Sequence, residues 1–318
     1  MLRRHLAGLA LATLALPASA QGDKIARLVI GFPAGQATDV IARLLADGLK
    51  GELGETVIVD NKPGQGGSIA LGQVARAAPD GTTMILAPLA SLVINPHLYK
   101  NVAYNTFTSF APVARVCDLP LVLVVHPSLP VKTLPELIAY AKANPDKLSH
   151  PSAGNGTLSH VVMEDFKARA GIRILHVPYQ GSPPAMNDLV AGNVQVAMDT
   201  VTVTKPLIDS GKLRLIAAGT LQRLPAFPDT PTIAEQGFPG LEAVAWLGVL
   251  FPAQTADDRV KRLSDAVVKV VNDPAMQEKF KAVGTLPRTM PTADFAAYLR
   301  SEDQRWSKVI ASSNIKTD

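Results

Sequence analysis

The sequence predicts an α/β protein of two domains with a ligand site in the cleft between them. Apolar, strand-like segments alternate with helix-like segments along most of the chain, which is typical of a parallel or mixed sheet covered by helices. The alternation falls into two series of roughly 100 residues, the size of an ordinary domain. Two longer apolar stretches, 111–127 and 241–253, separate the series and are interpreted as strands that cross between the domains.

The first series predicts three strands and two helices. Residues 26–31, 56–61 and 83–89 have the apolar composition of buried strands. Apolar residues at helical spacing predict one helix to about Lys50, with Thr38 as its N-cap, and a second helix over 68–78. The third strand is expected to end in a loop at Ala90-Ser91.

The second series repeats the pattern, and the tail adds helices. Helices are predicted over 134–143, 158–171, the segment from QGSPP to Ala191, and 203–212, and strands near 147–152 and over 172–179, 194–200 and 213–220. Two further helices are expected at 256–271 and 292–311, and the apolar face of the last one should pack on the first domain. These elements predict a discontinuous first domain, 21–118 plus 247–318, with the second domain, 119–246, inserted into it.

The first twenty residues have the layout of a signal peptide. Arg3 and Arg4 precede an apolar run over 6–16, and Ala18-Ser19-Ala20 follows as a cleavage pattern. The run is too short to cross a bilayer, which needs about 20 residues. We expect cleavage after Ala20 and a periplasmic protein; a buried N-terminal helix is the alternative.

Composition excludes several classes of function. The formal net charge is only +4, and no cluster of basic residues suggests nucleic-acid binding. The single cysteine, Cys117, excludes an intrachain disulfide and lies in an apolar strand pattern, as a buried hydrophobic residue would. The chain lacks the G-x-S-x-G, G-x-G-x-x-G and Walker A motifs. No catalytic residue and no cofactor is therefore expected.

One pair of residues has the spacing of metal ligands. His160 and Glu164 lie four residues apart on a predicted helix and could form one edge of a metal site. Spacing reveals no third ligand, so packing or a capping hydrogen bond is the favoured interpretation. No metal is expected.

Polar loops follow the predicted strands and lead into helices. They read FPAGQATD (32–39), PGQGGS (63–68), PLAS (88–91), SAGNGTLSH (152–160) and YQGSPP (179–184), and none contains Lys or Arg. In parallel α/β sheets such loops gather at the edge where ligands bind, and helix N-termini offer amide donors to an anion. A carboxylate fits better than a phosphate, which usually recruits a guanidinium. Ordinary βα loops are the alternative.

The same loops resemble a known family. They look like motifs of the Bug proteins, the periplasmic solute receptors of tripartite tricarboxylate transporters. Further motifs of that family follow in order: NPHLY, FAPVARV, HVPYQGSPPAMNDLVAGNVQVAMD and SGKLRLIAAGT. The resemblance runs in order from about residue 24 to 315. It implies a two-domain periplasmic binding-protein fold, type II-like, that closes on a small organic carboxylate and delivers it to membrane transporter subunits.

The resemblance also implies the site residues. The two loops that bind a carboxyl group in the family correspond here to Ala34, Gly35, Gln36, Thr38, Asp39, Ser152, Asn155, Gly156 and Thr157. Ser91 is added from the loop after the third strand, and Asp199 and Thr200 are expected to flank the far end of the ligand.

The sequence departs from the family pattern at a few of these loops. Ala34 stands where a second proline is usual, Gln36 where a glycine is usual, and Gln180 where a lysine is common. The loop after the third strand is also more apolar than usual. These departures favour a monocarboxylate or dicarboxylate with an apolar or aromatic body over citrate.

Two other functions are compatible with an exported two-domain protein or its cleft. A sensor subunit that presents ligand to a membrane signalling partner would have the same fold. An enzyme would need a nucleophile–base pair, which is not evident in the motifs. We expect a monomer that binds no nucleic acid.

Overall fold

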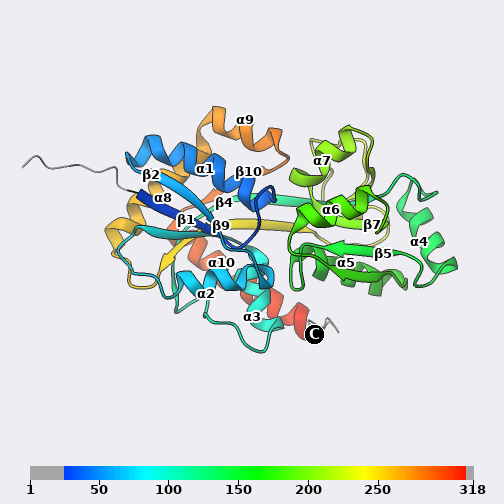
Figure 1. The fold of residues 1–318 in the computed structure, drawn as a ribbon, viewed down its shortest axis with the longest axis horizontal. Coiled ribbons are helices and arrows are strands. Elements are labelled where there is room, and N and C mark those ends of the chain that lie inside the picture. The colour runs from blue at the N-terminus through cyan, green and yellow to red at the C-terminus, as the bar shows by residue number, and fades with distance from the viewer. Residues whose placement is uncertain (1–24, 313–318) are drawn as a thin grey trace, which may run out of the picture.

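The computed structural model describes residues 25–312. Its elements form two lobes that lie side by side, joined by two long strands, β4 (Phe110–Val125) and β9 (Val244–Pro252) (Figure 1). The first lobe contains β1 (Ile25–Ile30), β2 (Thr56–Asn61), β3 (Thr83–Pro88), β10 (Leu286–Met290), α1 (Ala37–Leu53), α2 (Ser68–Val74), α3 (Asn95–Leu98), α8 (Asp257–Asn272), α9 (Pro274–Ala282) and α10 (Thr292–Ser312). The second lobe contains α4 (Leu134–Ala143), β5 (Ser149–Ser152), α5 (Leu158–Ala170), β6 (Leu175–Pro178), α6 (Ser182–Val190), β7 (Val196–Thr200), α7 (Val201–Asp209) and β8 (Arg214–Ala218).

The main sheet is mixed, as the alternation of strands and helices predicts. Its order is β10-β4-β9-β3-β1-β2, with β1 parallel to β2 and β3 and the two joining strands antiparallel to their neighbours. Within β4, residues up to Pro120 pair with β9, and residues from Leu121 onward pair with β7 and β8. A single strand therefore belongs to the sheets of both lobes.

Helices cover the sheet of the first lobe on both faces. Helices α1 and α9 lie on one side, and α2, α3 and α10 on the other (Figure 1). The expected packing of the last helix on this lobe is confirmed, since Phe295 is fully buried with its ring edge against Trp246. In the second lobe β5 and β6 form a separate parallel pair.

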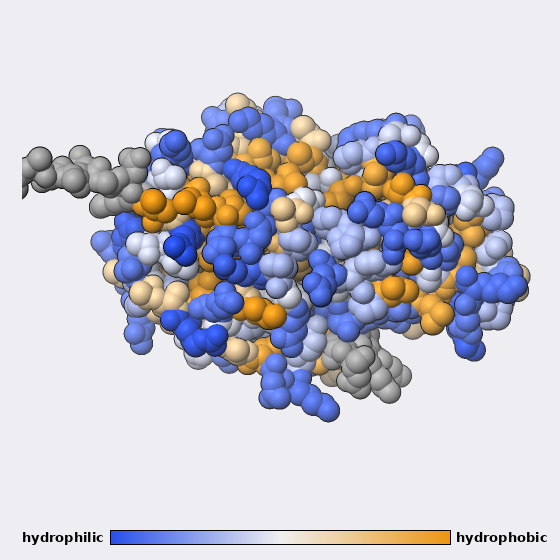
Figure 2. Space-filling model, viewed as in Figure 1, coloured by the Kyte–Doolittle hydropathy of each residue, from blue (hydrophilic) through white to orange (hydrophobic). Residues whose placement is uncertain are grey.

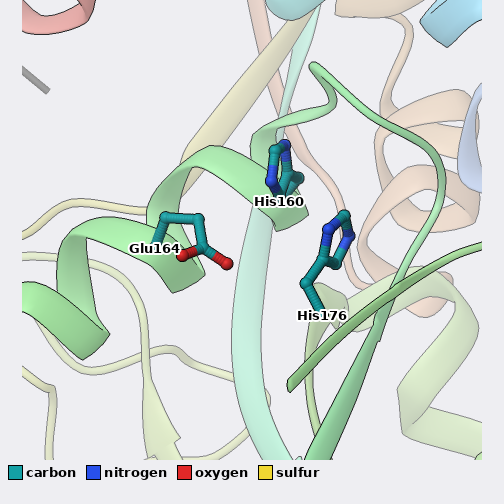
Figure 3. A group of neighbouring side chains, drawn as sticks. All are labelled: His160, Glu164 and His176. Carbon is teal, nitrogen blue, oxygen red and sulfur yellow. The ribbon is translucent and has the colours of Figure 1, made fainter. Parts of the chain in front are cut away.

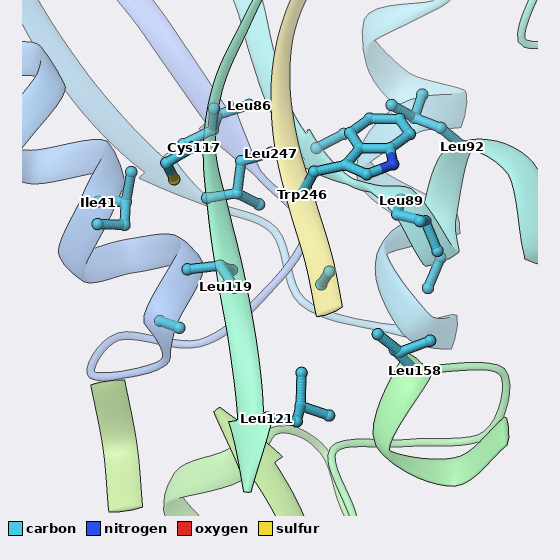
Figure 4. Packing of buried hydrophobic residues seen from close by; sticks show 14 of the residues in the cluster. Ile41, Leu86, Leu89, Leu92, Cys117, Leu119, Leu121, Leu158, Trp246 and Leu247 are labelled. Carbon is cyan, nitrogen blue, oxygen red and sulfur yellow. The ribbon is translucent and has the colours of Figure 1, made fainter. Parts of the chain in front are cut away.

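Aliphatic side chains from both joining strands form the core. Leu119 and Leu121 of β4 and Leu247 of β9 pack with residues of the first lobe, and Leu158 of α5 lies beside them (Figure 4). Cys117 is also fully buried in this cluster, as expected for a small hydrophobic side chain. Burial raises the pKa of its thiol far above the usual value, which makes it a poor nucleophile.

Several predicted element boundaries are wrong; α2, for example, ends at Val74 rather than at residue 78, and two further differences affect predicted site residues. Helix α1 begins at Ala37 with Gln36 as its N-cap, so Thr38 is a buried residue of the first turn. Ser91 lies in a π-helical turn, Ala90–Ile94, that continues into α3. This segment is buried throughout, and helical hydrogen bonds satisfy backbone groups that an open loop would leave unpaired.

The sequence interpretation missed α3, α9 and β10. Asp273 caps α9 by accepting a hydrogen bond from Met276 N, and Pro274 occupies the first helical position. Asp-Pro is a recognisable start signal, but the helix is short and follows α8 directly.

The predicted signal peptide, residues 1–20, lies outside the described residues. Within residues 25–312, the structure contains no helix with the length and apolar character needed to cross a membrane. The face shown in Figure 2 carries hydrophilic residues and several apolar patches on both lobes; Ile25 of β1 and Ile58 of β2 are about half exposed.

Candidate functional site

Four helices begin around one cavity between the lobes. The cavity has a volume of about 50 Å³. Residues from the first turns or N-caps of α1, α5, α6 and α7 line it, together with the joining strands. The lining residues are Phe32, Gln36, Ala37, Thr38, Pro88, Ala90, Leu119, Leu121, Ala153, Thr157, Leu158, Ser159, Ser182, Asp199, Thr200 and Ala245.

The N-cap residues of these four helices make no side-chain capping hydrogen bond. This holds for Gln36, Thr157, Gly181 and Thr200. Away from the cavity, α4 and α9 have side-chain caps, whereas α2 and α8 have none. The first-turn N–H groups of a helix have no partner within the helix and carry a partial positive charge. The cavity therefore combines the positive ends of four helices.

The walls between these helix ends are apolar. Leu119 and Leu121 of β4 and Ala245 of β9 line the cavity, with Phe32 and Leu158 beside them. Among the described residues that line it, none is Lys, Arg or His, and Asp199 is the single ionisable one. An anion here would be held by amides and hydroxyls rather than by a cationic side chain.

Gln36 connects the two lobes across the cavity. Its Oε1 accepts a hydrogen bond of 3.1 Å from Ser182 N at the start of α6. The Gly181 backbone packs against the Gln36 and Pro33 side chains so closely that an added Cβ would lie 2.4 Å from Pro33 Cγ. The side-chain oxygen of Gln36 thus occupies one first-turn N–H group of α6.

Asp199 lies buried at the far side of the cavity, at the end of β7. Burial raises the pKa of its carboxyl to about 6, although hydrogen bonds from Ser182 and Thr200 partly oppose this shift. Thr200 N donates to Asp199 Oδ1 at 2.6 Å. The carboxyl therefore changes charge near neutral pH.

A second cavity, of about 330 Å³, lies between loops of the two lobes. Its lining comes from residues 31–33, 63–66 and 99 on one side and 153–155 and 178–181 on the other. Tyr99 Oη donates to the backbone oxygen of Asn155 at 2.7 Å, which ties the two sides together. Asn155, in the loop before α5, is part of the lining of this cavity.

The predicted site residues separate into lining and supporting groups. Five line the smaller cavity: Gln36, Thr38, Thr157, Asp199 and Thr200. Asn155 lines the second cavity. The remaining six are Ala34, Gly35, Asp39, Ser91, Ser152 and Gly156, and in the described part of the chain they are not among the residues that line either cavity.

Asp39 supports the loop before α1 instead of facing the cavity. Its carboxylate accepts hydrogen bonds from Arg43, Asn61 and the Gly35 backbone N–H at 2.8–3.0 Å. Burial alone would raise its pKa, but these bonds outweigh that effect and lower it. The ionised carboxylate thereby fixes the loop that leads to Gln36.

Ser91, Ser152 and Gly156 also hold loops in place. Ser91 Oγ donates to Gly66 O at 2.6 Å. Ser152 Oγ lies 2.7 Å from His176 Nε2, and Gly156 N donates to His160 Nδ1 at 3.3 Å. These residues shape the loops rather than line the cavities.

The sequence interpretation missed the apolar wall and Ser182. Ser182 could have been predicted as a lining residue, because the QGSPP loop lies directly before a helix. Leu119, Leu121 and Ala245 had no such signal, because any strand residue in an apolar run looks like core until the strand's neighbours are known.

A cluster of histidines lies directly behind the loop before α5. His176 of β6 stacks on His160 with ring centroids 4.1 Å apart and on His150 at 4.9 Å. Figure 3 shows His160 and Glu164 on neighbouring turns of α5 with His176 beside them. Burial lowers the pKa of His160 to about 4 and that of His176 to about 3, so both rings are neutral at pH 7.

Comparison with known proteins places the chain among transport receptors. The family described as "Tripartite tricarboxylate transporter family receptor" matches residues 41–315. A Pseudomonas protein described as "UPF0065 protein in tcbD-tcbE intergenic region" is 38% identical over 314 residues, covering 97% of this chain and 93% of that protein. Protein BugT of Bordetella pertussis is 33% identical, with 97% and 96% of the two chains covered.

Solved structures share the fold over almost the whole described chain. The periplasmic binding protein BugD has a TM-score of 0.89 at 35% identity, covering 93% of this chain and 99% of that chain. Rpa4515 of R. palustris with adipate has a TM-score of 0.89 at 33% identity, covering 92% and 98%. MatC of Rhodopseudomonas palustris with bound malate has a TM-score of 0.85 at 29% identity, covering 90% and 99%.

Proposed function

This chain belongs to the tripartite tricarboxylate transporter receptor family, and from that premise we propose that it captures a small organic carboxylate in the cavity between its lobes and delivers it to transporter subunits in the membrane. The family is one of solute receptors with the periplasmic binding-protein fold, not a family of enzymes. We expect the bound carboxylate to leave the protein chemically unchanged.

The convergence on one cavity of three helix N-termini without a side-chain cap, those of α1, α5 and α7, carries the proposal. Each helix end favours a nearby anion by about 0.3–1 kcal/mol at exposed sites and up to about 2 kcal/mol in partly buried ones. Each charge-assisted hydrogen bond from an amide or hydroxyl adds about 1.5–3 kcal/mol. A few such contacts are sufficient to hold a carboxylate without an arginine or lysine.

The apolar walls favour a ligand with a hydrocarbon body. Phe32, Leu119, Leu121 and Leu158 offer no partner to the hydroxyl and additional carboxylates of citrate. Asp199 would repel a further carboxylate when ionised. The similar structures with adipate and with malate carry dicarboxylates. We propose a monocarboxylate or a dicarboxylate with an apolar or aromatic body as the ligand.

The remaining features of the receptor are part of the same proposal. The signal-peptide layout of residues 1–20 and the periplasmic relatives support export to the periplasm with cleavage after Ala20. The change of partners within β4 after Pro120 supports a division into 21–118 plus 247–318 and 119–246. We propose that the receptor acts as a monomer. The matched family does not favour the alternative of a sensor subunit.

A calorimetric screen of the mature protein tests the ligand class. Adipate, malate, benzoate, a longer aromatic carboxylate and citrate would be titrated separately, and small molecules released from natively purified protein would be identified by mass spectrometry. We expect at least one apolar or aromatic carboxylate to bind more tightly than citrate. Binding of citrate alone would contradict the proposed specificity, whereas binding of none of the carboxylates by well-folded protein would contradict the receptor function for carboxylates.

A further inference from the structure

The histidine cluster behind the ligand loop brings together three potential metal ligands. One ligand atom from each of His160, Glu164 and His176 lies within 4.8 Å of the other two (Figure 3). His160 and Glu164 form the i, i+4 edge on α5, and β6 supplies the third residue, which sequence spacing could not reveal. We propose that His160, Glu164 and His176 form a binding site for a divalent transition-metal ion such as Zn²⁺.

The donor set suits such an ion. Two imidazoles and one carboxylate, with water in the fourth position, are a common zinc ligand set, with metal–nitrogen distances of about 2.0–2.1 Å. The side chain of Glu164 is partly exposed, which gives an ion a path from solvent. The two rings lie nearly parallel, at 15°, so one ring turns about its Cβ–Cγ bond to direct a nitrogen at the ion.

Neighbouring residues hold the ligands from outside. Ser152 Oγ contacts His176 Nε2 at 2.7 Å, leaving Nδ1 for the ion. His150, fully buried, contacts Glu164 Oε1 through its Nε2 at 3.2 Å. Such outer contacts orient metal ligands and fix the histidine tautomer. His150 Nδ1 is itself buried without a hydrogen-bond partner among the described residues.

Two existing interactions compete with the ion. Lys167 Nζ lies 2.6 Å from Glu164 Oε1, and Gly156 N donates to His160 Nδ1. Burial opposes the charge on Glu164, yet bonds from His150 and Lys167 lower its pKa to about 2, so the carboxylate is already ionised. A bound ion displaces Lys167 from Glu164. The neutral His160 ring also gives up its hydrogen bond from Gly156 N, whichever of its nitrogens coordinates the ion. Removal of the lysine should therefore tighten ion binding.

Titration of the full mature protein with Zn²⁺ alone tests the site, and Co²⁺ provides a spectroscopic probe. We expect saturable binding of one Zn²⁺, visible-range absorption bands from bound Co²⁺, and at least about tenfold weaker binding in His176→Gln and Glu164→Gln. The matched control His126→Gln, a histidine outside the cluster, should bind like wild type. Lys167→Met should bind about tenfold more tightly, a gain that misfolding cannot produce.

The contrary results are equally definite. Absence of saturable Zn²⁺ binding by folded wild-type protein, or equal affinity in His176→Gln and His126→Gln, would overturn the site. Unchanged affinity in Lys167→Met would show that the ion does not use Glu164. Circular dichroism of each metal-free variant verifies folding, and the titration contains no carboxylate ligand, so its outcome is independent of the receptor function.

Discussion

Asp199 is the residue through which pH acts on the cavity. Its carboxyl is buried among Ser182, Thr200 and the apolar wall, and burial raises its pKa to about 6. In its protonated form the carboxyl can donate a hydrogen bond to a bound carboxylate, and in its ionised form it repels one. The affinity for a carboxylate ligand should therefore fall as pH rises through 6.

Stability should depend on Asp199 in the same pH range. The unfolded chain loses this proton near the ordinary pKa of 3.8, and the folded protein loses it near 6. Between these values the folded state binds more protons, so the contribution of Asp199 to stability falls as pH rises and levels off above about 6. One pKa unit corresponds to about 1.4 kcal/mol, so the full effect is on the order of 1–3 kcal/mol.

The variant Asp199→Asn tests both effects. The amide keeps an oxygen that can accept the Thr200 N–H bond, but it does not titrate. The free energy of unfolding, from urea denaturation, and the ligand affinity, from titration, are measured at pH 5 and pH 7.5. On going to pH 7.5, both quantities should fall less in the variant than in wild type. Identical pH dependence in the two proteins would show that another group is responsible.

Gln36 is expected to stabilise the contact between the lobes. Gln36→Ala leaves the buried Ser182 N–H without its acceptor and should lower the free energy of unfolding by about 1–3 kcal/mol. Gln36→Glu keeps an acceptor but adds a negative charge, so it should preserve stability and weaken carboxylate binding. Urea denaturation and calorimetry measure the two effects.

The surface residue Gln73 of α2 provides the control for Gln36. It is exposed, so Gln73→Ala should leave both stability and binding unchanged. If Gln36→Ala is as stable as Gln73→Ala, the hydrogen bond to Ser182 contributes nothing to the contact between the lobes.

The proposed receptor function assigns carboxylate binding to helix N-termini. The first turns of α1, α5 and α7 face the cavity without side-chain caps, and the Gln36 side chain occupies the first N–H group of α6. Removal of a single backbone donor would test whether these N–H groups bind the ligand. Proline can do this at the first helical position, where its fixed φ is compatible with the helix.

Ala37→Pro is the appropriate substitution in α1. Ala37 is the first residue of that helix, and Gln36 before it is already extended, with φ −79° and ψ 157°, the conformation that a following proline requires. Carboxylate affinity should fall about tenfold or more, because one charge-assisted hydrogen bond is worth about 1.5–3 kcal/mol. Stability should change little.

A matched proline at the start of another helix separates an effect on carboxylate affinity from a general effect of proline on the protein. Asp257 is the first residue of α8, away from the cavity, and its N-cap Ala256 is likewise extended in ψ. Asp257→Pro should retain wild-type affinity in the same calorimetric titration. Equal losses in both variants, or none in Ala37→Pro, would contradict amide-based binding by α1.

The cavity between the lobes is too small for a dicarboxylate in the described arrangement. Its volume of about 50 Å³ would hold one or two water molecules, whereas sites for small organic ligands occupy about 300–1,000 Å³. The lobes must therefore separate to admit a dicarboxylate. Bending of β4 and β9, the two strands that join the lobes, would allow this.

Small-angle X-ray scattering with and without ligand measures this motion. We expect the radius of gyration to change on saturation with ligand, because the described arrangement, with a cavity of about 50 Å³, cannot enclose a dicarboxylate. Ala37→Pro at the same ligand concentration, below its own dissociation constant, serves as a non-binding control. An unchanged radius on saturation would show that the lobes do not move on binding.

The sequence predicts the fold more completely than the site. Strand and helix periodicity locate most elements, and the apolar runs at 111–127 and 241–253 identify both joining strands. Sequence order alone does not show which side of a strand faces a cleft, so Leu119 and Leu121 could not be told from ordinary core. His176 joins His160 only because β6 pairs with β5 beside α5, a long-range contact that spacing does not reveal.

The place of β9 in the main sheet has a consequence for how the chain acquires its structure. β9 lies between β4 and β3, yet residues 244–252 are synthesised only after the entire second lobe. Until then, β3 and β4 each lack a neighbour, and their exposed edges invite pairing with other chains. Productive folding must wait until nearly four-fifths of the polypeptide has been synthesised. A truncated chain that ends before residue 244 should therefore aggregate. A cell benefits from keeping the nascent polypeptide extended until synthesis has passed that point.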